Sequence, residues 1–229
     1  MLTKIEAIVA LREQVKILRR GVKAWNRWRQ ENKSVRIDLR DAKLNSLDLQ
    51  NVDLRAADLR QARLSFSRLN DANLSNANLW YAKLGGANLS NANLNEANLR
   101  GADIGVTTVS NASFRFACLD GADLIEAKFI ATDFSFANLA SIRALRTNFE
   151  GATLTGACIE DWNVNRETNL NNVVCEYIFL NAKKRNSQAG YSDRFPPIPA
   201  TFEPGDFTRR IQNSLEAGDR AFREGFPRS

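Results

Sequence analysis

A five-residue period of apolar and polar positions runs through most of this chain, from Ile37 to Asn165. Every fifth residue from Leu39 to Val164 is apolar, and all 26 of these central positions hold Leu, Ile, Val or Phe except Ala144. The position two residues before the centre is Ala in 17 of its 26 occurrences, and the residue between them is mostly polar, often Asp or Asn. The two residues after the centre vary freely.

This period predicts a solenoid. A helix repeats every 3.6 residues and a strand every 2.0, so a period of five fits neither. A regular internal repeat indicates stacked units, and a unit that forms one side and one corner of a square brings the chain back after about 20 residues. The central and the small residues then point inward, and the polar residue between them points outward. The predicted fold is an all-β solenoid of about six and a half coils, stacked as parallel strands roughly 4.8 Å apart.

The repeat resembles a known family. The run ANLSN-ANLWY-AKLGG-ANLSN-ANLNE-ANLRG, from Ala72 to Gly101, is similar to the pattern A(D/N)LXX of the pentapeptide-repeat family. That family folds as a right-handed quadrilateral parallel β-helix, so the resemblance implies this fold for residues 36–180.

The interior follows from the same geometry, because residues 20 apart should stack on one side of the solenoid. The first half has a nearly pure Leu core, whereas the second half adds phenylalanines that can stack with one another across neighbouring coils. The predicted core residues are Leu39, Leu59, Leu79, Leu99, Leu119, Leu139, Phe114, Phe129, Phe134 and Phe149.

Residues 1–35 have a different pattern. Apolar residues from Ile8 to Trp25 follow a helical 3-4 spacing, which predicts one long amphipathic helix over residues 3–32. Gly21 weakens its middle by about 1 kcal/mol relative to Ala, so a kink or a break at that point is an alternative. The helix could cap the exposed first coil, form a dimer, or bind an anionic surface. The segment GVKAWNRWRQEN resembles the helical leader that precedes the repeats in some cyanobacterial members of the family. We predict that residues 1–35 form a helical cap on the solenoid.

The C-terminal region, residues 181–229, lies beyond the repeat. The run Val173–Leu180 predicts one last strand-like side, and residues 181–205 hold four of the five prolines and predict a loop. Phe207, Ile211 and Leu215 predict an amphipathic helix over residues 206–223, with Asp206 as its N-cap. We expect this helix to pack on the solenoid.

Composition restricts the chemistry. The chain has no histidine, which removes the commonest general base and metal ligand, so we predict that it is not an enzyme and needs no cofactor or metal. Cys118 and Cys158 fall at outward positions two coils apart, too far for a disulfide, and are predicted to be exposed. No apolar run is long enough for a transmembrane helix and no signal peptide precedes the repeats, which predicts a cytoplasmic protein.

Two outward clusters are candidate partner surfaces. Arg60, Trp80 and Arg100 should stack, which suggests cation–π pairing beside Tyr81 and could either stabilise the surface locally or bind a partner. A second, aliphatic cluster could be covered by the C-terminal tail or form an interaction surface. It consists of Ile125, Ile130 and Leu145.

These features favour a non-enzymatic scaffold for protein interaction or regulation, with an unidentified protein partner. The alternative is a role linked to nucleic acid, either through the basic residues 1–36 or by the DNA mimicry that some pentapeptide-repeat proteins direct at topoisomerases. Nucleic acid is the less expected partner, because the solenoid carries 12 Lys and Arg against 15 Asp and Glu and is nearly neutral. A homodimer through the helix or a solenoid end stays open.

Overall fold

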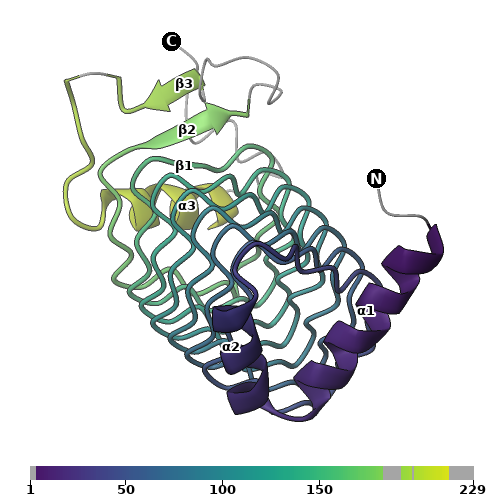
Figure 1. Ribbon diagram of the computed structural model, residues 1–229. Helices are drawn as coiled ribbons and strands as arrows, with labels where there is room; N and C mark the ends of the chain where they lie inside the picture. The colour runs from purple at the N-terminus through teal and green to yellow at the C-terminus, as the bar shows by residue number, and fades with distance from the viewer. Residues whose placement is uncertain (1–3, 183–191, 198, 217–229) are drawn as a thin grey trace.

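The computed structural model describes residues 4–182, 192–197 and 199–216. Three helices, α1 (Lys4–Arg19), α2 (Val22–Glu31) and α3 (Asp206–Glu216), flank a long stack of coils (Figure 1). Three short strands, β1 (Ala157–Cys158), β2 (Ile178–Asn181) and β3 (Ser192–Phe195), form a small sheet in the order β1-β2-β3. Strands β1 and β2 are parallel, and β2 and β3 are antiparallel.

The coils are held together by parallel bridges between residues 20 apart, beginning with Asp38 and Asp58. These bridges fall into four columns, which define the four sides of the stack. We name them face 1 (Asp38, Asp58, Asn78, Asn98, Cys118, Asn138, Cys158), face 2 (Lys43, Arg63, Lys83, Asp103, Asp123, Arg143, Asn163), face 3 (Asp48, Arg68, Asn88, Thr108, Lys128, Asn148, Asn169) and face 4 (Asp53, Asn73, Asn93, Ser113, Asp133, Thr153, Val174).

Each corner between two faces is a tight turn. The second residue after the centre takes a positive φ, as at Asp41 (56°) and Tyr81 (53°), and the backbone N–H of the next residue usually donates to the carbonyl of the centre. A positive φ at the third residue is typical of a type II turn. The outward Asp or Asn supports the turn, because its side-chain oxygen accepts a bond from the N–H two residues later, as Asn78 does from Trp80 at 3.2 Å. This Asx turn explains why the polar position prefers those two residue types.

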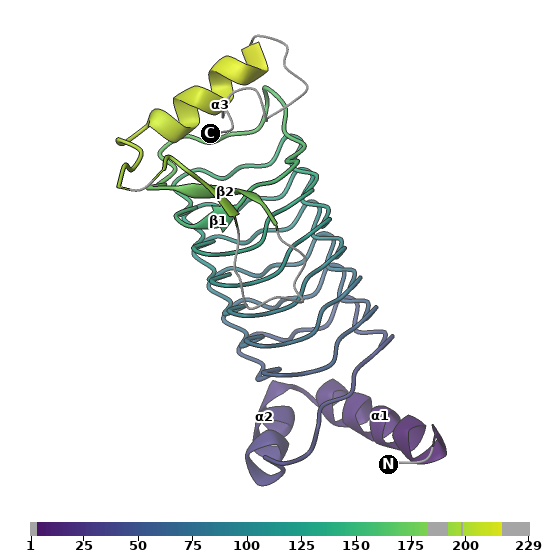
Figure 2. The ribbon, with the colours of Figure 1, turned by 90° about the horizontal axis from the view of Figure 1, so that it is seen from above.

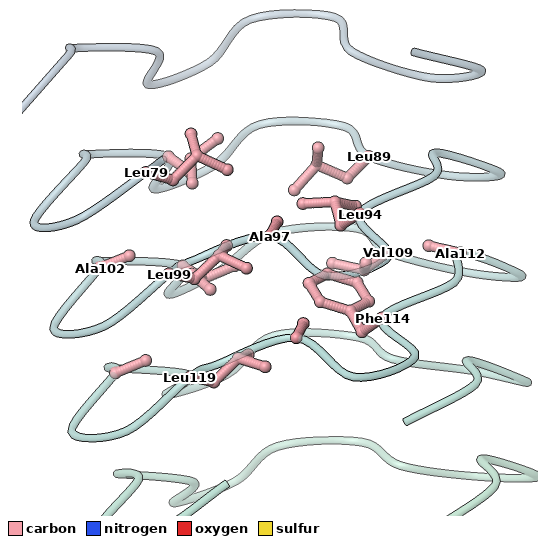
Figure 3. Packing of buried hydrophobic residues seen from close by; sticks show 14 of the residues in the cluster. Leu79, Leu89, Leu94, Ala97, Leu99, Ala102, Val109, Ala112, Phe114 and Leu119 are labelled. Atoms are coloured by element: carbon pink, nitrogen blue, oxygen red, sulfur yellow. The ribbon is translucent and has the colours of Figure 1, made fainter. Parts of the chain in front are cut away.

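The central and small residues fill the inside of the stack. Leu79, Leu99 and Leu119 lie one above another inside successive coils, and all three are 0% exposed (Figure 3). The phenylalanine rings pack in the second half, with ring centroids 5.2 Å apart for Phe114 and Phe134 and 5.6 Å apart for Phe129 and Phe149. All ten residues predicted for the core are 0% exposed.

Two helices, and not one, precede the solenoid. The prediction of a continuous helix over residues 3–32 is wrong, because Gly21 has a φ of 106° that no helix can include, and the chain breaks there between α1 and α2. Both helices lie against the first coil at one end of the stack (Figure 2). Trp25 is 0% exposed and its Nε1–H donates to the carbonyl of Asp53 at 2.8 Å. The side chain of Gln14 bonds to the backbone of Arg36 and Asp38.

The C-terminal end begins where the spacing changes. Asn148 bridges Asn169 and Thr153 bridges Val174, so the interval becomes 21 residues after one insertion between the 163 and 169 positions. Helix α3 lies at this end of the stack (Figure 2), with Phe207 and Ile211 buried and the Thr208 hydroxyl donating to the carbonyl of Leu170 at 2.8 Å. The predicted end of this helix at residue 223 lies outside the described residues.

Candidate functional site

The first candidate surface lies at the corner between faces 1 and 2. Arg60, Trp80 and Arg100 occupy the same position in successive coils, and Tyr81 follows Trp80 in the turn. Trp80 is 37% exposed and Tyr81 54% exposed, and their ring centroids are 4.8 Å apart. The corner therefore presents two adjacent aromatic rings to solvent.

The arginines beside Trp80 pair with carboxylates. Arg60 binds Asp58 through two hydrogen bonds, at 2.8 and 2.7 Å, and the Nε of Arg100 lies 3.0 Å from Asp120. Among the described residues the cation–π contacts join Arg115 to Phe116 and Phe136, Arg194 to Tyr177 and Arg210 to Phe195, so the three side chains stack as predicted but the suggested cation–π pairing at Trp80 is not formed. The two bonds to Asp58 fix the orientation of the Arg60 guanidinium.

A groove of about 980 Å³ runs along face 1 beside this corner. Its floor is the column of short polar side chains that includes Asn78, Asn98 and Asn138. Trp80 and Tyr81 line it at one edge of the face, and Phe116, which is 53% exposed, lines it at the other. The groove thus has a polar floor between aromatic edges.

Three aromatic rings at the corners, two of them exposed and the third half-buried, lie over a glycine of the next coil. A Cβ atom on Gly101 would stand 2.5 Å from the Tyr81 ring, one on Gly86 would stand 2.5 Å from Phe66, and one on Gly156 would stand 2.6 Å from Phe136. Each glycine follows its aromatic residue by 20 positions and has a positive φ. The interval of 20 residues between each ring and its glycine is present in the sequence, but it is recognised only when the coils are aligned with one another.

A further aromatic pair lies at the corner between faces 4 and 1. The rings of Phe116 and Phe136 are stacked, with centroids 5.0 Å apart and an interplanar angle of 7°, and the Arg115 guanidinium is 5.8 Å from each centroid. Stacked rings of this kind are rigid apolar surfaces. Sequence reasoning missed this pair because it treated the two positions after the centre as free.

The second candidate surface spans two corners: Ile125 and Leu145 lie between faces 2 and 3, and Ile130 lies at the next corner, between faces 3 and 4. Ile125 and Leu145 are half-buried and Ile130 is 36% exposed. Arg166, one coil beyond Leu145, donates to the carbonyls of Leu215 and Glu216 at the end of α3. The described tail therefore reaches the C-terminal end of this cluster and leaves Ile130 exposed.

Carboxylates that pair with arginines on the solenoid have shifted pKa values. The hydrogen bond from Arg40 lowers the pKa of Asp38, and the bond from Arg55 does the same for Asp53, in both cases against a smaller opposing effect of burial. These shifts favour the charged form at neutral pH and stabilise the surface without creating a reactive acid.

The cysteines are buried, contrary to prediction. Cys118 is 6% exposed and Cys158 is 0% exposed. The reason is that a short side chain lies between longer ones in its column, since Cys158 pairs with Asn138 on one side and Phe179 on the other. Burial raises the pKa of the Cys158 thiol to about 12, which keeps it protonated and unreactive.

Within residues 4–182, 192–197 and 199–216, none of the helices has the length and apolar character that crossing a membrane requires. The cytoplasmic location stays a prediction.

Comparisons with known proteins agree with the geometry. A family model described as pentapeptide repeats, with eight copies, matches residues 37–76, 72–105, 110–143 and 132–163. A comparison with curated proteins finds no match.

Solved structures with related repeats include a pentapeptide repeat protein of the Arabidopsis thaliana thylakoid lumen. It is 29% identical, with a TM-score of 0.43, and the match covers 43% of this chain and 69% of that one. Rfr23 from the cyanobacterium Cyanothece 51142 is 25% identical, with a TM-score of 0.19 and coverage of 66% and 93%. The plasmid-mediated fluoroquinolone resistance protein QnrB1 is 18% identical, with a TM-score of 0.29 and coverage of 62% and 90%. All three TM-scores are below 0.5, and the repeat model alone carries the assignment.

Proposed function

Because this chain belongs to the pentapeptide repeat family, whose fold is the right-handed quadrilateral β-helix, we propose that it is a non-enzymatic scaffold that binds a protein partner. The binding surface in this proposal is face 1 together with the corner that holds Trp80 and Tyr81. The observation that carries it is the exposure of these two adjacent rings beside a groove of about 980 Å³.

The composition of this surface suits a protein–protein interface. Trp, Tyr and Arg are the residue types that contribute most to binding energy at such interfaces. Trp80 and Tyr81 are held by a turn that repeats in every coil, and Arg60 is fixed by its two bonds to Asp58. A surface that is already ordered loses little conformational entropy on binding, which favours affinity.

We further propose that helices cap both ends of the solenoid. The helices α1 and α2 would cap the first coil and α3 the last, over a β-helix of about six and a half coils and its C-terminal extension. Support comes from buried contacts at both ends, with Trp25 bonded to Asp53 and Thr208 bonded to Leu170. Capped ends favour binding to the sides of the solenoid over a homodimer formed through its open coils.

A nucleic-acid role has less support. Most arginines of the solenoid form ion pairs on their own face or corner, as Arg68 does with Asp48 and Arg143 with Asp123. The paired charges leave neither the continuous positive surface that a duplex needs nor the continuous negative one that a mimic needs.

Affinity capture from the native host, followed by reconstitution with the purified partner, tests the proposal. We expect Trp80→Ala to weaken the reconstituted complex at least about tenfold, since an interface Trp is commonly worth about 2 kcal/mol or more. Val106→Ala is the control for the aromatic corner, because Val106 is 64% exposed at the corner between faces 2 and 3. Ile125→Asp tests the second candidate surface in the same assay.

The results separate the possibilities. A loss with Trp80→Ala and unchanged affinity with Val106→Ala would support the aromatic corner. If only Ile125→Asp loses affinity, the partner binds at the corner between faces 2 and 3 instead. Equal affinity for all four proteins, or no partner at all, would contradict the proposal.

A further inference from the structure

Face 2 begins with three basic side chains in one column. Lys43 bridges Arg63, and Arg63 bridges Lys83, and all three side chains are exposed. Bridge partners in parallel strands lie roughly 4.8 Å apart, and like charges directly opposite one another destabilise a sheet. The guanidinium of Arg19 extends the row, because it donates to the carbonyl of Lys43 at 3.0 Å.

This column lacks the neutralisation found elsewhere on the solenoid. Eight of the 12 Lys and Arg between residues 37 and 164 form ion pairs, and all of these residues are described. The four that form none are Lys43, Arg63, Lys83 and Lys128. Three of the four are therefore stacked in one column of face 2.

The opposite case shows how the protein treats a like-charge pair that it neutralises. Asp38 and Asp58 are bridge partners at the start of face 1. Arg40 contacts both carboxylates, and Arg36 and Arg60 also bind Asp58. Two carboxylates lie beside the basic column and form no ion pair with it: Asp103 is the bridge partner of Lys83 and accepts a bond from the Gly105 N–H at 3.2 Å, and Asp41 lies in the corner turn.

Aromatic rings border the column on both sides. A depression of about 470 Å³ is lined by all three basic residues, by Tyr81 and by the acidic residues Asp41 and Asp103, and a second one is lined by Arg63, Lys83 and Phe66. Phe66 is 72% exposed and lies over Gly86, and Tyr81 lies over Gly101. The strip therefore combines a cationic centre with apolar edges.

The strip is short. The next two residues of the column are Asp103 and Asp123, so a long polyanion that ran along the solenoid would meet like charge after three coils. A nucleic acid gains affinity by contacting many phosphates in succession. A few carboxylates between apolar side chains match the dimensions of the strip better.

We propose that the strip on face 2, formed by Arg19, Lys43, Arg63 and Lys83 between Phe66 and Tyr81, binds a short acidic segment of a partner protein. The inference rests on the proposed function in that the ligand belongs to a protein. Carboxylates of the segment neutralise the basic column, and its apolar side chains contact the two rings. Binding thereby removes a repulsion that the free protein carries.

Fluorescence anisotropy with synthetic probes tests this inference. The probe is a labelled peptide of four glutamates with a leucine at either end, and its control replaces the glutamates with glutamines. The tested variant is K43Q/R63Q/K83Q. The matched control, R55Q/R68Q/R146Q, removes the same charge from arginines that are ion-paired elsewhere. A labelled oligothymidylate of about ten nucleotides is the second anion.

We expect the glutamate peptide to bind the wild type at least about tenfold more tightly than the glutamine peptide, with affinity that falls as salt rises. The face 2 variant should lose at least about tenfold in affinity and the control variant less than about twofold. No binding to the wild type, or equal losses in both variants, would overturn the proposal. Tighter binding of the oligothymidylate that is lost in the same variant would overturn it in favour of nucleic acid.

Thermal unfolding of the free protein gives an independent readout. Neutralising the column relieves repulsion, so K43Q/R63Q/K83Q and the single variant R63Q should melt no lower than the wild type. Melting below the wild type in both would contradict the repulsion on which the inference stands. If the peptide fails to bind but Trp80→Ala weakens the native complex, this inference fails and the proposed function survives.

Discussion

The ring of Tyr81 covers Gly101, the residue one coil further on: a Cβ there would stand 2.5 Å from Cε1 of the ring. Gly101 has a φ of 62°, so its lack of a side chain serves the turn as well as the ring. Gly121, the next residue of this column, has a φ of 68° and nothing within 4 Å of its hypothetical Cβ. The two glycines share a backbone role, and only the first holds a ring in place.

This difference makes the pair a matched test. Gly101→Ala and Gly121→Ala should each reduce stability by about 1–2 kcal/mol, because both residues adopt the left-handed conformation. Only Gly101→Ala should displace Tyr81, which would change the NMR signals of its ring. An unchanged Tyr81 spectrum in Gly101→Ala would contradict the ring's position over the glycine.

The two ends of the solenoid should respond separately to loss of their buried contacts. Trp25→Ala removes a fully buried ring and its bond to Asp53. Phe207→Ala removes a ring of α3 that is only 2% exposed. Each should cost about 3–5 kcal/mol locally. Because coils contact only their neighbours, amide exchange should rise in the first coils for Trp25→Ala and in the last coils for Phe207→Ala. Uniformly faster exchange in either variant would argue against the capping roles.

A buried hydroxyl should contribute measurably to the interior. Thr132 is 1% exposed and its hydroxyl donates to the carbonyl of Val109 at 2.7 Å, whereas the other bond to this carbonyl, from Ala112, is 3.5 Å long. Thr132→Val keeps the shape and leaves the carbonyl poorly satisfied. We expect a loss of about 1–2 kcal/mol in chemical denaturation. A variant as stable as the wild type would show that the bond adds nothing.

Stability should fall in acid through the paired carboxylates. The pKa of Asp53 is lowered in the folded protein by Arg55 to below its usual 3.8, so its contribution is present above about pH 3.8 and is lost as the pH falls through the folded value. Asp53→Asn should therefore cost about 0.5–1 kcal/mol at pH 5, and the gap to wild type should close as the pH falls below 3.8. A gap that stays constant across this range would exclude the pairing as its cause.

The sequence predicted the interior well because the period of five leaves one geometric solution. Because each coil takes 20 residues, residues such as Leu79 and Leu99 must lie one above the other inside successive coils. The alanines then occupy the inward positions where space is smallest. The break at Gly21 was foreseen only as an alternative, because helical spacing continues on both sides of it. The bonds of Arg19 and Asn26 to the first coil, on either side of the break, are long-range contacts that helical periodicity does not encode.

The outer surface was predicted less well, because several side chains there compete to bind the same charged or aromatic group. The arginines beside Trp80 were expected to stack on the indole, but Asp58 and Asp120 bind them instead. The burial of Cys158 depends on β2, which reaches its place only after the one-residue insertion near residue 165. The basic column of face 2 could have been found from Lys43, Arg63 and Lys83 at intervals of 20, whereas its lack of acidic partners required the side chains.

The indole N–H signals of the four tryptophans give the most direct test of the proposed binding surface. Trp80 is exposed beside the groove of face 1, whereas Trp25 and Trp162 are buried at 0% and 5% exposure and Trp28 lies with α2 at the N-terminal end. On addition of the purified partner, we predict that the Trp80 signal shifts and those of Trp25 and Trp162 stay in place. A shift of Trp28 with an unchanged Trp80 would show that the partner binds the N-terminal helices and would contradict the proposal.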